Sequence, residues 1–349
     1  MSRVIVTGGS GFIGCNLVEH LAAAGHDVVN LDIRRPRNHA AAGEFVPLDI
    51  LDRKAFVAAI RNFDPHYMFH FAARTDLEGT NDADYAANIE GVSNAVNAGL
   101  SAPSLKRMVF ASSMYVCRVG HVPRSDDEYC PHTAYGRSKM LGEQTVRQEA
   151  ADKFCWAIVR PTSIWGPWFA IPYISFFHAV RRGWYVHPKG RTIRRSYGFV
   201  LNTVWQLKQL MECGESAKVH GRMFYLADYE PTDPLRWAQI IADSFGGRKV
   251  REAPLGLLRL GAKIGDALKF AGVTTPPLFS SRLNNLLTNA VFDLSPIREI
   301  SGEQPYTLAE GVAITVEWMR QHVFQSQPDI QIRNSPVPQK HRECNSSNQ

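Results

Sequence analysis

The glycine-rich run at residues 7–14, with the sequence TGGSGFIG, constrains the fold of this chain more than any other feature. It lies between a short apolar run and a helical pattern at 15–24, which predicts a strand, a tight turn and a helix start. We expect Gly8 to permit the turn, Gly11 to let the backbone approach a diphosphate, and Gly14 to let helix and strand pack closely. Free N–H groups and a positive dipole at a helix start bind phosphate. The run therefore predicts a dinucleotide-binding site.

A carboxylate at the end of the next predicted strand indicates which dinucleotide is bound. Asp32 follows Gly14 by 18 residues, and a carboxylate about 20 residues on accepts a hydrogen bond from the ribose 2′-hydroxyl. It also repels a 2′-phosphate, so we expect NAD rather than NADP. Two alternatives remain at this point. Asp32 simply begins a solvated loop, or Arg34 and Arg35 weaken the discrimination.

Strand-like and helical segments alternate through the first half of the chain. The predicted strands are 3–7, 27–32, 45–50, 67–73, 107–113 and 155–161, and the predicted helices are 15–24, 52–62, 82–98 and 134–150. This alternation is typical of an α/β fold with a doubly wound parallel sheet. Beyond residue 161 the alternation stops, and the predicted elements are 202–213, 222–227, 233–245 and 308–323.

The length of 349 residues and the hydrophobic share of 45% suit one or two closely packed domains. We expect a dinucleotide-binding domain at 1–165 and a mainly substrate-binding domain at 166–325, partly interleaved with the sheet. The segment 326–349 is polar and contains proline, so we expect a disordered tail.

Charge and cysteine usage restrict the partners and the compartment. The net charge is +6, but the basic residues are scattered, which suits an anionic small molecule better than nucleic acid. The six cysteines are irregularly spaced, which predicts neither a metal site nor a disulfide framework and favours the cytoplasm. We also expect no signal peptide and no integral membrane segment, since no apolar run approaches about 18 residues.

The segment 254–270 has an amphipathic pattern. Arg259, Lys263, Asp266 and Lys269 fall on one face, with leucines and alanines opposite. We expect a surface helix that covers the smaller domain. The alternative is a helix that lies on a membrane surface.

Tyr135 and Lys139 are four residues apart in a predicted helix, so they share one face. A free tyrosine has a pKa near 10 and is a poor base at neutral pH. A neighbouring ammonium and the positive nicotinamide ring would lower the pKa of Tyr135 to about 7, a demand of ~4 kcal/mol. Ser112 and Ser113 end the strand 107–113 and would lie beside the nicotinamide at the carboxyl edge of the sheet. Either hydroxyl would orient the substrate oxygen.

These motifs together resemble the extended short-chain dehydrogenase/reductase family, in particular its nucleotide-sugar epimerases and dehydratases. The resemblance covers about residues 3–320 and implies a Rossmann domain with a smaller C-terminal substrate domain. It rests on the glycine run and on segments at 48–50, 70–73, 88–91, 135–143, 160–167, 195–200, 293–294 and 308–318.

The resemblance implies roles for individual residues. Aligning 110–116 on the family's strand end makes Ser113 the catalytic hydroxyl, together with Tyr135 and Lys139. The implied substrate contacts are Arg74, Ser113, Tyr135 and Arg195, with Arg195 on the diphosphate. The implied NAD contacts are Gly8, Gly11, Phe12, Ile13, Gly14, Asp32, Asp49, Ile50, Phe71, Ala72, Ala73, Asn88, Ser112, Tyr135, Lys139 and Pro161.

The reaction type follows from two positions after Ser113. Dehydratases and decarboxylating relatives carry acidic residues where this chain has Met114 and Tyr115, so elimination of water would lack its proton donor. The resemblance therefore implies an NAD-dependent epimerase of a nucleotide-diphosphate sugar in polysaccharide biosynthesis. It would oxidise a ring hydroxyl, C4 being our expectation, transiently to a ketone. The alternatives are a net dehydrogenase or reductase of a nucleotide sugar or sterol-like alcohol, and a non-catalytic NAD-binding regulator. A homodimer through 82–98 and 134–150 is also implied.

Overall fold

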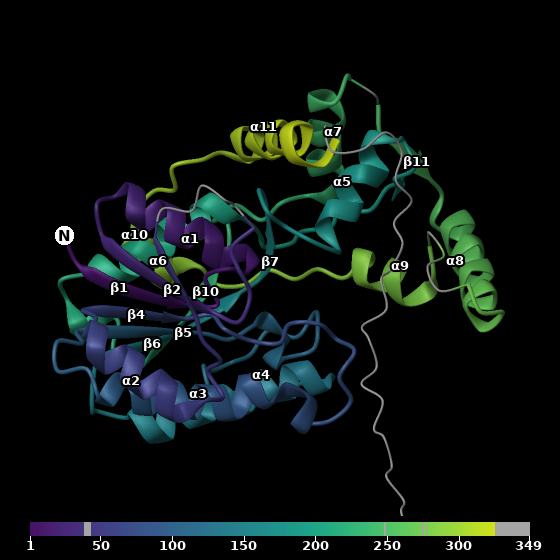
Figure 1. Ribbon diagram of the computed structural model, residues 1–349. Helices are drawn as coiled ribbons and strands as arrows, with labels where there is room; N and C mark the ends of the chain where they lie inside the picture. Colours follow the sequence, from purple (N-terminus) through teal and green to yellow (C-terminus); the bar gives the residue numbers. More distant parts are fainter. Residues whose placement is uncertain (38–42, 248, 274–275, 277, 325–349) are drawn as a thin grey trace, which may run out of the picture.

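The computed structural model describes residues 1–37, 43–247, 249–273, 276 and 278–324; the tail expected at 326–349 lies outside them. Seven parallel strands form the central sheet in the order β10-β6-β5-β4-β1-β2-β3 (Figure 1). The strands are β1 (Arg3–Thr7), β2 (Asp27–Asp32), β3 (Glu44–Pro47), β4 (Tyr67–His70), β5 (Arg107–Ala111), β6 (Trp156–Pro161) and β10 (Arg222–Leu226). The structure confirms the predicted doubly wound parallel sheet.

Helices cover both faces of this sheet (Figure 1). One face carries α2 (Arg53–Phe63), α3 (Ala86–Leu100) and α4 (Ala134–Thr145), and the other carries α1 (Phe12–Ala23), α6 (Val200–Glu212) and α10 (Ser295–Ser301). The inner residues of these strands other than β3 are mostly apolar and buried, because helices cover both faces of the sheet. Strand β10 and helix α6 come from the second half of the chain, so that half completes the sheet.

Several boundaries differ from the predicted ones for local reasons. Strand β5 ends at Ala111, two residues early, because the Ser113 side chain caps a 3₁₀ turn at Met114–Val116 by accepting a hydrogen bond from the Tyr115 N–H. Helix α1 begins at Phe12 rather than at residue 15, directly after the glycine turn. The last turn of the helix predicted at 134–150 is a π-helix at Val146–Ala150.

A second hydrophobic core lies beside the sheet, among elements that follow residue 161. Trp165 and Trp237 are fully buried there with their ring centroids 5.2 Å apart. The elements that enclose or adjoin this core are β7 (Ser163–Trp165), α5 (Tyr173–Arg181), β8 (Val186–Pro188), β9 (Tyr197–Phe199), α7 (Pro234–Ser244), β11 (Arg251–Ala253) and α11 (Leu308–Met319). Strands β7 and β9 pair with each other, as do β8 and β11.

Helix α8 (Leu255–Phe270) lies at the periphery of the molecule and packs against α9 (Ser280–Leu287) (Figure 1). Only Ala262 and Gly265 of α8 are buried. The leucine-rich side of α8 faces solvent, so the expectation that it covers the smaller domain is wrong. None of the described helices is long and apolar enough to cross a membrane.

Candidate active site

The glycine turn has the conformation that its sequence predicts. Gly8 has φ +73°, and a Cβ atom there would lie 2.5 Å from the Ala72 nitrogen. A Cβ at Gly14 would lie 2.2 Å from the Gly8 carbonyl oxygen, so α1 approaches the turn too closely for any side chain. Gly11 is the N-cap of α1 and offers no side-chain acceptor. The first-turn N–H groups of Phe12 and Ile13 therefore stay available to a diphosphate.

Asp32 is buried at the end of β2 and held against this turn. Its carboxylate accepts hydrogen bonds from the N–H groups of Ser10 and Arg34, each at 3.0 Å. It does not begin a freely solvated loop. A carboxylate has about four acceptor positions, so two remain for a ribose hydroxyl.

The segment after β4 forms a second wall beside the glycine turn. The Phe71 N–H donates to the Thr7 carbonyl at 3.0 Å, and Phe71, Ala72 and Ala73 are all half-buried. His70 is buried beneath them and shares a 2.9 Å hydrogen bond with the Thr7 hydroxyl. Burial lowers the pKa of His70 to about 3, with a smaller contribution from the Lys139 charge, so the imidazole is neutral.

Other predicted cofactor residues lie around the carboxyl edge of the sheet. Asp49 is exposed and accepts a 2.9 Å hydrogen bond from the Leu51 N–H. Ile50 is buried and packs against Gly91 of α3. Pro161 ends β6 and is half-buried. Contact of these residues with NAD stays a prediction.

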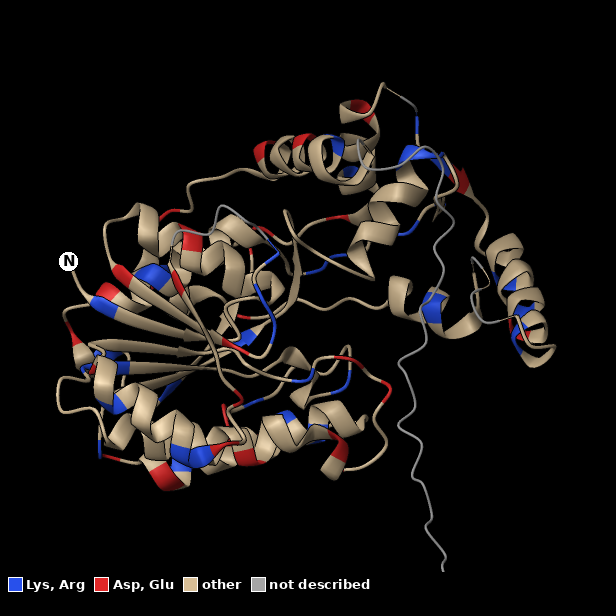
Figure 2. Cartoon of the chain, viewed as in Figure 1, with Lys and Arg blue, Asp and Glu red and all other residues tan. Residues whose placement is uncertain are grey.

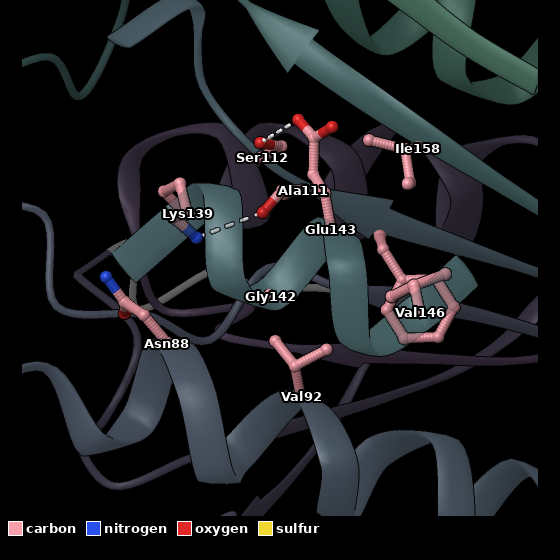
Figure 3. A pocket seen from close by; sticks show the side chains of 10 residues that line it. Asn88, Val92, Ala111, Ser112, Lys139, Gly142, Glu143, Val146 and Ile158 are labelled. Carbon is pink, nitrogen blue, oxygen red and sulfur yellow. Dashed lines mark hydrogen bonds between the residues drawn. The ribbon is translucent and has the colours of Figure 1, made fainter. Parts of the chain in front are cut away.

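Tyr135, Ser113 and Lys139 are brought together at the carboxyl end of β5, and all three are buried. Burial raises the pKa of Tyr135 to about 12, and a hydrogen bond with the Ser113 hydroxyl acts in the opposite direction. Lys139 donates from Nζ to the Ala111 carbonyl oxygen at 3.0 Å (Figure 3). Burial lowers the pKa of Lys139 to about 8. The protein alone therefore does not produce the lowered Tyr135 pKa that the sequence pattern predicts.

Ser112 contacts Glu143 of α4 and has different hydrogen-bond partners from the adjacent Ser113. Its hydroxyl donates to the Glu143 carboxylate at 2.5 Å, on the inner side of α4 (Figure 3). Glu143 also pairs with Arg160 of β6, whose Nε and Nη2 each lie 2.8 Å from the carboxylate. Tyr129 donates a fourth hydrogen bond at 3.0 Å. The sequence analysis assigned no role to Glu143 or Arg160. A charged residue on the buried face of α4 and another within the apolar strand β6 could have indicated a buried ion pair.

Asn88 of α3 joins two parts of the site. Its side-chain oxygen accepts from the Arg74 N–H, and its amide donates to the Arg74 carbonyl and to the Ser138 hydroxyl, at 2.8–2.9 Å. Both amide hydrogens are thus used within the protein. Asn88 supports the cofactor wall and α4, and its predicted direct contact with NAD stays a prediction.

The two arginines predicted to bind substrate differ in their surroundings. The Arg74 guanidinium forms a two-bond pair with Asp76 at 2.8 and 3.0 Å and also donates to the Asp84 carbonyl. Arg195 is buried, and its Nη1 donates to the carbonyl oxygens of Asn285 and Thr288 at 2.5 and 3.2 Å. Its Nε has no partner among the described residues.

Arg195 lies in a tyrosine-rich region that connects it to Tyr135. Its guanidinium carbon is 5.8 Å from the Tyr197 ring centroid. Burial raises the pKa of Tyr115, and the Arg195 charge opposes this shift. The Tyr115 and Tyr135 rings meet edge to face at 6.2 Å. No sequence spacing indicates this arrangement, because Tyr115 and Tyr197 belong to distant segments.

Comparisons with known proteins agree with this architecture. A model of the NAD dependent epimerase/dehydratase family matches residues 4–182. The 3 beta-hydroxysteroid dehydrogenase/Delta 5-->4-isomerase of Mycobacterium tuberculosis is 29% identical over 338 residues, covering 87% of this chain and 86% of that protein. The UDP-glucose 4-epimerase of Mycolicibacterium smegmatis is 27% identical over 337 residues, with 91% and 98% covered.

A solved structure shows the same fold. The Bordetella bronchiseptica enzyme WbmG, in complex with NAD and UDP, superposes with a TM-score of 0.68 at 19% identity, covering 92% of this chain and 96% of that chain. The matched family model spans both the glycine turn and the residues at Ser113, Tyr135 and Lys139. The chain therefore belongs to the NAD dependent epimerase/dehydratase family, within the extended short-chain dehydrogenases/reductases, and its cofactor is NAD.

Proposed function

We propose that the protein epimerises a nucleotide-linked sugar through transient oxidation of a ring hydroxyl at C4. Ser113, Tyr135 and Lys139 supply the groups for alcohol oxidation, and Arg195 supplies a site for the diphosphate. The similarity to a UDP-glucose 4-epimerase over almost the whole chain supports the same reaction class.

Tyr135 is the proposed base, and its pKa gives the free energy that is needed to ionise the phenol at neutral pH. With a pKa of about 12, ionising the phenol at pH 7 costs about five pKa units, or ~7 kcal/mol. This exceeds the ~4 kcal/mol expected for an exposed tyrosine. NAD, when bound, would supply the hydride acceptor and the positive charge of its nicotinamide ring. Its charge acts strongly in a buried site, because the effective dielectric is low there.

Ser113 and Lys139 complete the proton transfer. The Ser113 hydroxyl lies close enough to Tyr135 to oppose the rise of its pKa, so it can hold the substrate oxygen at the same point and share its proton. Lys139 must turn from the Ala111 carbonyl toward the ribose to stabilise the phenolate. Tyr135 then removes the hydroxyl proton and later returns it, after the keto sugar has turned over in the site.

The observation that carries the choice of substrate is the environment of Arg195. No carboxylate of the described residues forms an ion pair with this buried cation, and its Nε is unpartnered. A buried charge without a counter-ion is costly. A diphosphate supplies both the negative charge and the acceptor that a guanidinium binds well. A neutral sterol supplies neither.

The surroundings of Tyr135 also favour epimerisation over dehydration. Met114 and Tyr115 follow Ser113 and carry no acid. Glu143, the buried acid of α4, is committed to Arg160. Elimination of water therefore lacks a free proton donor at these positions.

A net oxidoreductase of a lipophilic alcohol is the second candidate, favoured by the similarity to the mycobacterial hydroxysteroid dehydrogenase. One assay distinguishes epimerisation from net oxidation. The protein with NAD is incubated with UDP-, GDP- and dTDP-sugars, and with sterols, while absorbance at about 340 nm and the sugar products are followed. We expect a new sugar epimer without net NADH. Stoichiometric NADH formation with a sterol, and no sugar conversion, would contradict the proposal.

Two variants test the residue roles in that assay. Tyr135→Phe should retain NAD but lose turnover by about 100-fold or more, because proton transfer by a positioned side chain contributes roughly 10²–10⁴-fold. Arg195→Met should raise KM about 10–100-fold, the value of lost bonds to a charged ligand.

A homodimer through α3 and α4 and a role in polysaccharide biosynthesis remain further parts of this proposal. Light scattering tests the dimer.

A further inference from the structure

The segment between Ser113 and Tyr135 brings two cysteines together. Cys117 and Cys130 pair in an isolated parallel bridge, in which the Cys130 N–H donates to Val116 and the Arg118 N–H donates to Cys130, at 3.0 and 3.1 Å. One ligand atom each from Cys117, His121 and Cys130 lies within 4.8 Å of the other two. The prediction that the cysteines form no metal site rested on their spacing, which does not show this juxtaposition.

We propose that Cys117, His121 and Cys130 bind a zinc ion. Two thiolates and one imidazole are a donor set that zinc prefers. Tetrahedral bonds of about 2.3 Å to sulfur and 2.0 Å to nitrogen hold the ligand atoms roughly 3.5 Å apart. The three side chains therefore need to close by only about 1 Å, within reach of small rotations.

Glu128 completes the surroundings of this site. Its Oε1 lies 2.9 Å from His121 Nε2, and its other oxygen accepts from the Arg124 N–H at 2.6 Å. A carboxylate that holds one imidazole nitrogen orients the other toward a metal. Zinc binding displaces the two thiol protons to solvent and leaves a fourth position for water. The ion would fasten the loop that connects Ser113 to Tyr135.

Metal analysis of the intact protein tests this site. Protein purified with reductant and without chelator should contain one zinc per chain, and Co²⁺ exchanged into it should show a thiolate charge-transfer band. Cys117→Ser and Cys130→Ser should each lose the metal, whereas Cys213→Ser, a partly buried cysteine elsewhere, should keep it. Absence of zinc and of the Co²⁺ band from the wild type would overturn the proposal. A Cys117–Cys130 disulfide formed in place of metal binding would also overturn it.

A separate observation concerns the exposed side of α8. Leu257, Leu260, Ile264 and Leu268 recur at helical spacing and are 41–62% exposed, and Phe270 at the helix end is almost fully exposed. Arg259 and Lys263 lie on the exposed polar side of the same helix, where Figure 2 shows basic residues. Apolar side chains on one side and cations on the other are typical of helices that lie on anionic lipid.

We infer that α8 binds the surface of a membrane that contains anionic lipid. The helix lies at the periphery of the molecule (Figure 1), and its apolar side chains are exposed, so they can enter the lipid boundary. The cations are complementary to acidic headgroups. A surface helix needs no spanning segment, in agreement with the lengths of the described helices.

Helix α9 connects this surface to the proposed diphosphate site. Asp266 of α8 accepts a hydrogen bond from the Ser280 N–H at 3.0 Å, and the backbone of α8 at Gly265 contacts Leu278. At the other end of α9, the Asn285 carbonyl accepts from Arg195. If the proposed function holds, this arrangement presents Arg195 to sugar diphosphates that are attached to membrane lipid.

Flotation with vesicles tests the membrane surface without substrate. The protein should bind vesicles of phosphatidylcholine with phosphatidylglycerol, and more weakly those of phosphatidylcholine alone. The triple variant Leu257→Ser, Leu260→Ser, Ile264→Ser should bind about 100-fold more weakly, because three apolar side chains no longer enter lipid. Trp184→Ser is the matched control, since Trp184 is equally exposed but lies outside α8.

Two results would overturn this inference and leave the proposed function intact. One is equal binding of the wild type and the triple variant to the acidic vesicles. The other is absence of vesicle binding together with a wild-type dimer that the triple variant dissociates, which would make α8 a contact between copies. Turnover of soluble nucleotide sugars is measured without vesicles, so its failure would count against the proposed function alone.

Discussion

Replacing Glu143 by glutamine should destabilise the protein strongly, because it removes the counter-ion of a buried arginine. Glu143 and Arg160 have side chains that are 1% and 0% exposed, and two hydrogen bonds of 2.8 Å join them. Burial lowers the pKa of Arg160, but the bonds and charge of Glu143 more than offset this, and the net pKa is raised. Breaking a buried pair by removal of one partner costs about 3–5 kcal/mol. We expect Glu143→Gln to lose that amount.

Urea unfolding monitored by tryptophan fluorescence measures this loss. Glu212→Gln is the control, since Glu212 forms a partly exposed pair with Lys208 one helical turn away. Such a pair is worth about 0.3–0.5 kcal/mol. Adding Arg160→Met to Glu143→Gln should restore part of the stability, because apolar replacement of a whole buried pair is often neutral. A loss for Glu143→Gln as small as that of the control would refute the reasoning.

Gly14→Ala should weaken NAD binding about 10-fold or more in calorimetry, since its Cβ would lie 2.2 Å from the Gly8 oxygen and push α1 off the turn. Gly256→Ala, with open space around it, should bind NAD normally. Lys139 has a pKa of about 8 when folded and about 10.4 when unfolded, so its contribution to stability rises between these pH values. Lys139→Met should therefore exceed the wild type in unfolding free energy by on the order of 3 kcal/mol below pH 8, and this advantage should shrink towards pH 10. A pH-independent difference between the two proteins would contradict the buried cation.

The order of strands and helices was predictable because both faces of this sheet are buried. The inner residues of β1, β2, β5 and β6 are mostly apolar, and helical patterns alternate with such strands along the first half of the chain. The partner of β10 was not predictable, because its place beside β6 depends on a long excursion of the chain. The prediction that α8 covers the smaller domain was wrong, because an amphipathic pattern does not specify which face of a helix packs against the protein.

The candidate site also has features that the sequence predicted and features that it could not predict. Tyr135 and Lys139 follow from helical spacing, and Gly8 follows from the turn that it permits. The direction of the Lys139 side chain, the Tyr135 pKa and the pairing of Arg74 with Asp76 depend on burial and on contacts between distant segments. Cys117 and Cys130 were not predictable as neighbours either, because an isolated β-bridge between two loop segments brings them together.

Asn88 of α3 links the loop that contains Arg74 to helix α4, so these parts cannot be exchanged independently in an engineered protein. Its amide group binds the backbone on both sides of Arg74 and the hydroxyl of Ser138 at once. Aspartate lacks the two N–H groups that these acceptors require, and glutamine is one methylene longer. A chimera that takes α4 from a relative must therefore also take α3 and the Arg74 loop. Recombination between such enzymes should succeed only where crossovers leave these three pieces together.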